Sequence, residues 1–167
     1  MSGASAARTV TILKDLGFTD VVSIPDGESR HLYQAFLDDP DIEVYLPARE
    51  GEGIAIAAGL WVGGRKPVVV LQNTGLMESG DALRGCGIGP SIPLLLLVGW
   101  RGYPGAMAGA TPIDSAYPYT EPLLDAWGLP HRRLMTDSDL GVIGEMAAAA
   151  DASSKPAAVI YGYGFMP

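Results

Sequence analysis

A single carboxylate that opens a run of small residues is the first feature of this sequence that could do chemistry. Glu50 is followed by Gly51 and Gly53, two glycines that would let the backbone approach another group closely. An acidic side chain at the start of a helix is, however, ordinarily a capping residue. The segment alone leaves both roles open. Glu52, two residues further on, competes with Glu50 for the chemical role.

Polar residues also follow the apolar runs elsewhere in the chain. Gln72, Asn73 and Thr74 end the most apolar of these runs, where such residues are also common in turns. Asp26 stands in a Pro-Asp-Gly turn after an earlier run. Arg101 follows a later run, and its guanidinium group suits sulfonate or phosphonate oxygens as well as an ordinary ion pair within a loop.

Several common kinds of site are excluded by what the sequence lacks. No G-x-G-x-x-G motif follows an apolar run, and neither a Walker A motif nor a G-x-S-x-G motif occurs. The histidines, His31 and His131, lie too far apart in sequence to suggest a histidine-rich metal site, and His31 alone is typical of an amphipathic helix. Cys86 is the only cysteine, so the chain has neither an internal disulfide nor a cysteine-based metal cluster.

Charge and hydropathy exclude two further classes of partner. The formal net charge of −8 argues against non-specific binding of nucleic acid, which needs clustered Lys and Arg. The longest apolar stretch, residues 92–100, is too short to span a bilayer, and no basic amphipathic segment suggests a membrane surface. The N-terminus does not resemble a secretory signal, so we expect a cytoplasmic protein.

Short apolar runs alternate with helix-like segments along the whole chain. This alternation predicts one α/β domain over residues 1–167, with a six-stranded parallel sheet between two layers of helices. The segment 100–119 is long for a passive connection, so we interpret it as a functional or interface loop. We expect strands at 20–24, 42–46, 67–71, 93–98, 131–134 and 157–161, and helices at 6–16, 28–37, 50–62, 75–84, 121–127 and 138–150.

This fold class predicts where the polar residues meet. Ligands of parallel α/β sheets bind beyond the carboxyl ends of the strands. The four segments that follow the first four strands therefore come together at one edge: residues 25–27, 48–50, 72–74 and 100–102.

The order and spacing of these motifs resemble the pyrimidine-binding domain of thiamine-diphosphate-dependent decarboxylases, over roughly residues 8–162. Glu50 stands nine residues before Gly59 of an Ala-Ala-Gly segment, as in that family. The segment Gln72–Gly75 is similar to the family's Gln-Asn-Ser-Gly, with Thr74 in place of serine, and the segment 98–105 is similar to the strand end and loop that follow. Within the family, the chain is most similar to the alpha subunit of sulfopyruvate decarboxylase and to phosphonopyruvate decarboxylase.

The resemblance implies a cofactor and roles for named residues. Glu50 would bond a ring nitrogen of the aminopyrimidine of thiamine diphosphate and so activate the cofactor. A carboxylate in a dry interface suits this task, because its pKa is raised and it can share a proton. Gln72, Asn73 and Thr74 would contact the cofactor, and the first two also the substrate. The weaker substrate candidates are Asp26, His31 and Arg101, with Glu28 in the same turn as Asp26.

The sequence also departs from the family. Thiamine-diphosphate enzymes bind the diphosphate through a metal held by a Gly-Asp-Gly…Asn motif. The only asparagine here is Asn73, and the only Gly-Asp pair, Gly80-Asp81, follows it. We therefore expect no metal ligand in this chain, and a separate beta chain that carries the motif, holds Mg²⁺ and shares the cofactor. The segments 78–81 and 106–119 lack an asparagine and a histidine of relatives, which leaves the substrate open.

Three functions remain open from the sequence. The leading one is the alpha subunit of a hetero-oligomeric decarboxylase that acts on a small anionic 2-oxo acid, sulfopyruvate or phosphonopyruvate. A charged content of only 18% fits a large covered interface, although an Ala- and Gly-rich composition explains it equally well. The alternatives are a thiamine-dependent subunit for another 2-oxo acid or for carboligation, and a non-catalytic flavodoxin-like assembly module.

Overall fold

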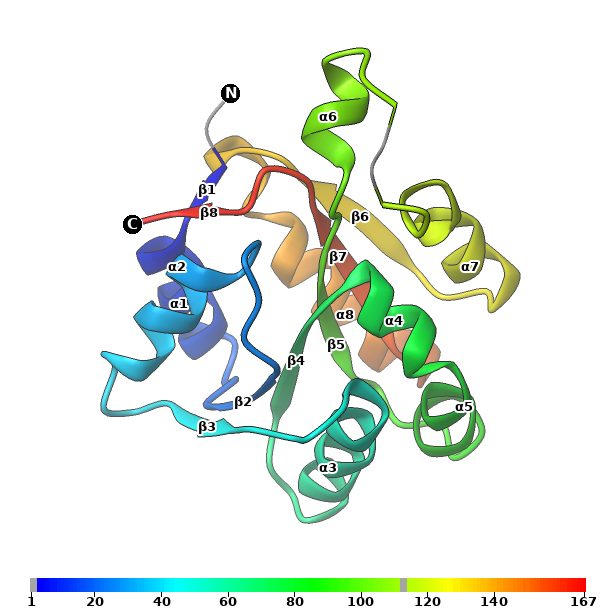
Figure 1. The fold of residues 1–167 in the computed structure, drawn as a ribbon. Helices are drawn as coiled ribbons and strands as arrows, with labels where there is room; N and C mark the ends of the chain where they lie inside the picture. Colours follow the sequence, from blue (N-terminus) through cyan, green and yellow to red (C-terminus); the bar gives the residue numbers. More distant parts are fainter. Residues whose placement is uncertain (1–2, 112–113) are drawn as a thin grey trace.

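The structure, a computed structural model that describes residues 3–111 and 114–167, is built on a six-stranded parallel sheet of order β3-β2-β4-β5-β7-β6 (Figure 1). The strands are β2 (Asp20–Ser23), β3 (Glu43–Tyr45), β4 (Pro67–Gln72), β5 (Leu95–Gly99), β6 (His131–Leu134) and β7 (Ala157–Tyr161). The helices are α1 (Ala6–Asp15), α2 (Arg30–Leu37), α3 (Glu50–Val62), α4 (Asn73–Glu78), α5 (Gly80–Ala82), α6 (Tyr103–Met107), α7 (Thr120–Ala126) and α8 (Val142–Ser153).

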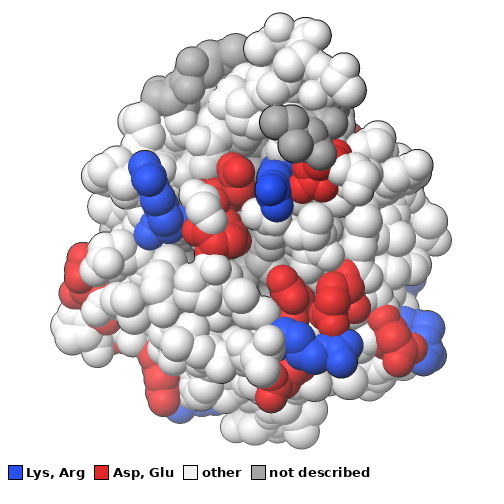
Figure 2. All heavy atoms as spheres, in the orientation of Figure 1, with Lys and Arg blue, Asp and Glu red and all other residues white. Residues whose placement is uncertain are grey.

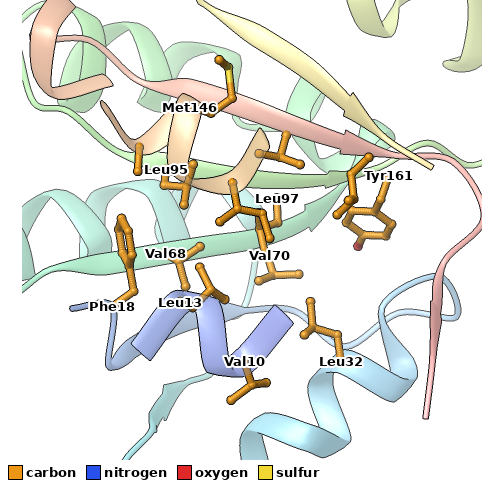
Figure 3. Packing of buried hydrophobic residues seen from close by; sticks show 14 of the residues in the cluster. Val10, Leu13, Phe18, Leu32, Val68, Val70, Leu95, Leu97, Met146 and Tyr161 are labelled. Atoms are coloured by element: carbon orange, nitrogen blue, oxygen red, sulfur yellow. The ribbon is translucent and has the colours of Figure 1, made fainter. Parts of the chain in front are cut away.

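The central strands are buried on both faces, as their unbroken apolar sequences predict. Successive side chains point to opposite faces of the sheet. Val68 and Val70 join a core with α1, α2 and α8, whereas Val69 and Leu71 join a second core with α3, α4 and α7. Figure 3 shows the first core, where side chains of α1 and α2 meet those of β4 and β5. The predicted three-layer α/β/α class is therefore confirmed.

The segments 75–84 and 100–119 differ from the sequence prediction. The helix expected at 75–84 begins at Asn73 and continues through α5 into a π-helical segment, Leu83–Ile88. The expected loop at 100–119 contains α6 and a short 3₁₀ helix, Tyr117–Tyr119; its residues 112 and 113 lie outside the described part. No helix within the described residues is both long and apolar enough to cross a bilayer.

The two ends of the chain form a small parallel sheet that the sequence did not predict. β1 (Ala4–Ser5) pairs with β8 (Phe165–Met166), and Figure 1 shows both beside α2. Glycine is required here, because a methyl group on Gly3 would lie 2.0 Å from the carbonyl oxygen of Gly164. Strands of two residues carry no periodic signal, so only the tertiary structure reveals them.

The strand order brings the chemically interesting segments together. The chain runs from β2 outward to β3 and then crosses back over β2 to β4, so the loops that follow β2 and β4 leave from adjacent strands. Such a reversal opens a crevice at the carboxyl edge of a parallel sheet. The β2–α2 turn and the starts of α3 and α4 border this edge.

At the amino edge of the sheet, one buried carboxylate, that of Asp20, joins neighbouring segments by hydrogen bonds and an ion pair. The Asp20 side chain is 1% exposed, its Oδ1 lies 2.7 Å from Nη2 of Arg65, and its Oδ2 accepts a hydrogen bond from Nε of Arg65 at 3.1 Å. The Tyr45 hydroxyl donates to Oδ1 at 3.2 Å. Burial and the bonds to Glu43 and Asp20 raise the pKa of Tyr45 to about 12, which keeps this donor protonated. The network joins β2, β3 and the turn before β4.

Replacing Asp20 with Asn should lower the free energy of unfolding by about 2 kcal/mol, because the bonds to a charged acceptor are weakened and Arg65 is left with its more exposed partner Glu43 at 3.3 Å. Urea unfolding followed by circular dichroism measures this. Asp41→Asn is the control, since Asp41 pairs with Lys14 at 2.8 Å with a side chain 69% exposed. That change should cost less than about 0.5 kcal/mol. Equal losses in the two variants would contradict a stabilising role for the Asp20 network.

Candidate active site

Glu50 is the first residue of α3, and its half-buried side chain lies against the first turn of α4. Gly75 makes this approach possible. A methyl group at residue 75 would stand 2.5 Å from Cγ of Glu50 and 2.7 Å from its Oε1, distances that real atoms do not adopt. Residue 75 must therefore be glycine for the Glu50 side chain to lie where it does.

The other acidic side chains at the start of α3 hold the helix in place. Glu52 accepts a hydrogen bond from the N–H of Ala48 at 2.6 Å. Glu78, the last residue of α4, accepts one from the N–H of Gly51 at 2.7 Å and pairs with Arg49 at 2.6 Å. These carboxylates satisfy N–H groups at the helix start and interact favourably with its dipole. The capping role that the sequence left open thus falls to Glu52 and Glu78.

Glu50 has no such task. Among the described residues no group donates a hydrogen bond to its carboxylate or forms an ion pair with it, whereas both neighbouring acids are engaged. A small cavity of about 10 Å³ connects Glu50 with Ser23 and Ile24 at the end of β2. The Ser23 hydroxyl is buried and has no partner within the described residues. The cavity is large enough for about one water molecule.

The polar residues after β4 divide into two groups. Gln72 and Thr74 are at least partly exposed, and the Thr74 hydroxyl donates to Oε1 of Gln72 at 2.8 Å. Asn73 is fully buried, and its amide nitrogen is 3.3 Å from both the carbonyl of Arg101 and the hydroxyl of Thr120. The structure therefore brings Gln72 and Thr74 to the crevice, but uses Asn73 to hold the loop that follows β5.

Asp26 organises the β2–α2 turn. Its Oδ1 accepts hydrogen bonds from the N–H groups of Glu28 at 2.6 Å and Ser29 at 2.9 Å. Its Oδ2 is inaccessible to solvent and has no partner among the described residues. The hydroxyl of Tyr161, at the end of β7, is likewise buried without a partner. Burial raises the pKa of Tyr161 well above its usual range, and the carboxylates of Asp26 and Glu28 raise it further.

Glu28 is the half-buried acid of this turn. Burial raises the pKa of its carboxyl, and the Asp26 carboxylate raises it as well. Arg101 lowers the pKa of Glu28 and Asp114 raises it, so both lie close enough to act on it. Figure 2 shows acidic and basic side chains gathered around a hollow on this face, over the β2–α2 turn and the start of α3.

Arg101 follows β5, and its side chain is 56% exposed. Its Nε lies 3.5 Å from Oδ2 of Asp114, whose side chain is only 7% exposed. Both residues line a pocket of about 300 Å³ together with glycine, proline and alanine of the segment 102–110. Trp100 anchors this loop, because its ring stacks on Tyr117 at 5.3 Å and its Nε1 donates to the Tyr117 carbonyl at 3.0 Å.

His31 lies elsewhere. It lines a separate hollow with Ala6 and Ala7 of α1 and with the C-terminal Pro167, and its Nε2 accepts a hydrogen bond from Nε of Arg30 at 3.2 Å. The structure does not bring His31 to Glu50, so we leave it out of the site proposed below.

A hollow of about 370 Å³ lies at the amino ends of β4 and β5, far from the crevice along the strands. Its cationic residues are already engaged. Lys66 donates to the carbonyl of Leu16 at 3.0 Å and lies 4.6 Å from the ring centre of Phe18, and Arg65 is bound to Asp20. The buried hydroxyls without a hydrogen-bond partner, those of Ser23 and Tyr161, lie instead at the carboxyl edge of the sheet.

Sequence reasoning missed part of this cluster. Ser23 and Tyr161 are ordinary strand residues in the sequence, and only the sheet register brings their hydroxyls to the carboxyl edge. Asp114 lies in the segment interpreted as functional, and that was its only signal. Glu28 was a secondary candidate through the family resemblance of its turn. No group of three or more His, Cys, Asp or Glu that could hold a metal occurs within the described residues.

Comparisons with known proteins place the chain in one family. Residues 5–117 match the family described as "Thiamine pyrophosphate enzyme, N-terminal TPP binding domain". Phosphonopyruvate decarboxylase of Streptomyces viridochromogenes is 34% identical over 100 residues, which cover 60% of this chain and 25% of that protein. The chain thus matches about a quarter of the length of this relative.

Two further similarities extend over most of the chain. Sulfopyruvate decarboxylase subunit alpha of Methanothermobacter thermautotrophicus is 29% identical over 150 residues, which cover 89% of each chain. The crystal structure of benzoylformate decarboxylase from Polynucleobacter necessarius superposes with a TM-score of 0.80 at 19% identity, over 98% of this chain and 32% of that one. At 19% identity, the similarity to benzoylformate decarboxylase shows a shared fold.

Replacing Gly75 with Ala should displace the Glu50 side chain and lower the free energy of unfolding by about 1–3 kcal/mol, because an extra methyl group must be forced into an occupied position. The double variant with Glu50→Ala should recover most of that loss, since the atoms that clash are then gone. Urea unfolding of both single variants and of the double variant measures the coupling.

Gly144→Ala in α8 is the matched control, because a methyl group there meets nothing within 4 Å. It should stabilise the protein by up to about 1 kcal/mol through helix propensity. Strictly additive effects of the changes at residues 75 and 50 would show that the two residues do not contact each other as described.

Proposed function

This chain belongs to the family of N-terminal TPP-binding domains of thiamine pyrophosphate enzymes, and on that premise we propose that it is the pyrimidine-binding chain of a 2-oxo-acid decarboxylase. The observation that carries the proposal is Glu50. It is the one carboxylate at the start of α3 that has no structural partner among the described residues. Because Gly75 has no side chain, Glu50 has room to lie against the first turn of α4.

The residues around Glu50 fit the pyrimidine end of thiamine diphosphate. The cofactor, when bound, supplies the electron sink for loss of carbon dioxide. Glu50 would donate or accept a proton at a ring nitrogen. The unpartnered hydroxyl of Ser23, across the small cavity, offers a second polar contact on the same side.

The diphosphate end of the cofactor needs a second chain in this proposal. The described residues contain no group of acidic, histidine or cysteine side chains that could hold a metal. We therefore propose that a beta chain binds Mg²⁺ and the diphosphate, and that the whole of this chain acts as one pyrimidine-binding domain. The similarity to a protein named as a subunit alpha, over 89% of both chains, supports this division.

The proposed substrate is a small 2-oxo acid with a second anionic group. Arg101 lines the pocket beyond β5 and is only partly neutralised by Asp114, since the two side chains form an ion pair at 3.5 Å without a hydrogen bond. Its guanidinium suits a sulfonate or phosphonate. Gln72 and Thr74 would orient the 2-oxo acid end, and Asn73 would position Arg101 through the backbone of the loop. The names of the relatives, sulfopyruvate and phosphonopyruvate decarboxylase, agree with this choice.

We expect carbon dioxide to be released from sulfopyruvate or phosphonopyruvate only when this chain is mixed with a diphosphate-binding partner chain, thiamine diphosphate and Mg²⁺. Each chain alone should be inactive, because neither holds both ends of the cofactor. A coupled assay of aldehyde formation, run side by side with pyruvate, measures activity and substrate preference. Full activity of this chain alone would refute the division of the cofactor between two chains.

Replacing Glu50 with Gln should reduce turnover of the mixed enzyme at least about 100-fold, as is typical for loss of a group that transfers protons. Glu52→Gln is the matched control, because an amide oxygen can still accept the hydrogen bond from Ala48. That variant should stay within several-fold of the wild type. Steady-state kinetics of the two variants separates the two glutamates, and an undiminished Glu50→Gln enzyme would remove the basis of the proposed function.

A further inference from the structure

The pocket beyond β5 carries a hydrogen-bond acceptor that the described part of the chain does not use. Asp114 lines this pocket of about 300 Å³, and its side chain is only 7% exposed. Its Oδ1 accepts a hydrogen bond from the N–H of Ala116 at 2.8 Å, whereas its Oδ2 has no hydrogen-bond partner among the described residues. Leaving a buried carboxylate oxygen without a donor is unfavourable, so a ligand that brings a donor to this atom gains affinity.

Arg101 lies beside this oxygen but does not satisfy it. Its Nε is 3.5 Å from Oδ2 of Asp114, which makes an ion pair without a hydrogen bond. The Arg101 side chain is 56% exposed, and within the described residues it pairs with no other carboxylate. Its N–H groups are therefore free to bind an anion in the pocket, and such an anion lies next to the Asp114 carboxylate.

The loop holds Arg101 and Asp114 near each other before any ligand arrives. Gly102 has a φ of +93°, and a methyl group there would lie 3.1 Å from Cβ of Tyr117 and 3.5 Å from Cβ of Asp114. The Trp100 ring donates from Nε1 to the Tyr117 carbonyl at 3.0 Å. The two ends of the loop are thus packed together, so the separation of the charged pair is set by the fold.

Further charges act at the same place. Asp26 and Asp114 raise the pKa of Glu28, and Arg101 lowers it, so the four side chains are coupled electrostatically. Three of the four are acidic and one is basic. An anion with one negative charge gains from Arg101, but a second negative charge on the same group is repelled by the neighbouring carboxylates.

Phosphonate and sulfonate groups have the same shape but differ in one proton. Each places three oxygens around a tetrahedral centre. A sulfonate is fully ionised throughout the pH range in which proteins work, so it offers only acceptors. A phosphonate monoanion keeps one O–H group, since even the more acidic phosphate esters lose their second proton only at about pH 6. The phosphonate monoanion therefore accepts hydrogen bonds and donates one as well.

We propose that Asp114 selects a 2-oxo acid with a monoanionic phosphonate over one with a sulfonate, an inference that rests on the proposed function. Arg101 turns from Oδ2 of Asp114 toward the ligand and donates to two phosphonate oxygens, and the P–OH group donates to the uncovered Oδ2. A sulfonate in this position sets an oxygen against Oδ2 with no proton between them. A phosphonate dianion does the same with one more negative charge, so the pocket rejects both.

Binding of two unreactive probes tests the selection without turnover. Phosphonoacetate and sulfoacetate carry the two groups but have no 2-oxo group. At about pH 6, where the phosphonate keeps its proton, phosphonoacetate should bind the chain at least about 10-fold more tightly than sulfoacetate. At about pH 9, where that proton is lost, the preference should vanish. NMR titration of the ¹⁵N-labelled chain, followed at the amide of Gly102, measures both affinities. Equal affinities at the lower pH, or no binding of phosphonoacetate, would overturn the inference.

Asp114→Asn replaces the unused acceptor with a donor of the same shape. The amide oxygen can still accept the N–H of Ala116, and the amide nitrogen can donate to a sulfonate. The affinity for sulfoacetate at about pH 6 should rise at least about 10-fold, and the preference for phosphonoacetate should be lost. Asp125→Asn is the matched control, because it removes the same charge from a side chain of α7 that is 73% exposed. A preference that survives Asp114→Asn would show that another group makes the selection.

A ratio of rates gives the same test in the mixed enzyme. Titration of Asp26, Glu28 or any other protein group affects both substrates, whereas only phosphonopyruvate loses a proton of its own. The ratio of kcat/KM for phosphonopyruvate to that for sulfopyruvate should fall at least about 10-fold between about pH 6 and about pH 9. The fall should be absent in Asp114→Asn. A ratio that does not change with pH in the wild type would contradict the selection.

The binding and activity measurements separate the two proposals. If no 2-oxo acid releases carbon dioxide with any partner chain, the proposed function fails, and the probes still show whether Asp114 prefers the monoanion. If carbon dioxide is released but the probes bind equally, the decarboxylase stands and the selection by Asp114 falls.

Discussion

The close approach of α3 and α4 at the carboxyl edge of the sheet is the constraint on which the candidate site depends. Gly75 in the first turn of α4 leaves room for the Glu50 side chain, and Glu78 at the end of α4 caps α3. A larger residue at 75 would push the helices apart or turn Glu50 away. The two helices follow different strands, so the parallel sheet must first bring their starts to one edge.

The acids at this edge have different tasks, and hydrogen bonds decide which. Glu52 and Asp26 accept hydrogen bonds from backbone N–H groups. These bonds order the start of α3 and the β2–α2 turn, but they leave the two carboxylates less free to bind a ligand. Glu50 and Glu28 project from the segments thus ordered, and no group of the described chain accepts or donates to their carboxyls. Structure and chemistry are therefore divided between neighbouring residues, with one capping acid beside each unengaged acid.

The sequence predicted the sheet and the position of Glu50 because both depend on local patterns. Apolar runs such as Pro67–Leu71 identify buried strands, and α3 begins and ends where its glycines and Glu50 indicate. The burial of Asn73 was not predictable, because its partners are Arg101 and Thr120, far along the chain. Register across the sheet likewise decides which hydroxyls reach the edge, and a single sequence carries no signal for it.

The charge balance at the crevice bears on the proposed substrate. Asp26 and Asp114 raise the pKa of Glu28, and Arg101, which pairs with Asp114, lowers it. If all three carboxyls were charged, an anionic 2-oxo acid would be repelled by a net negative site. The raised pKa of Glu28 lessens that repulsion, and Arg101 offers the positive charge that the second anionic group of the proposed substrate would need.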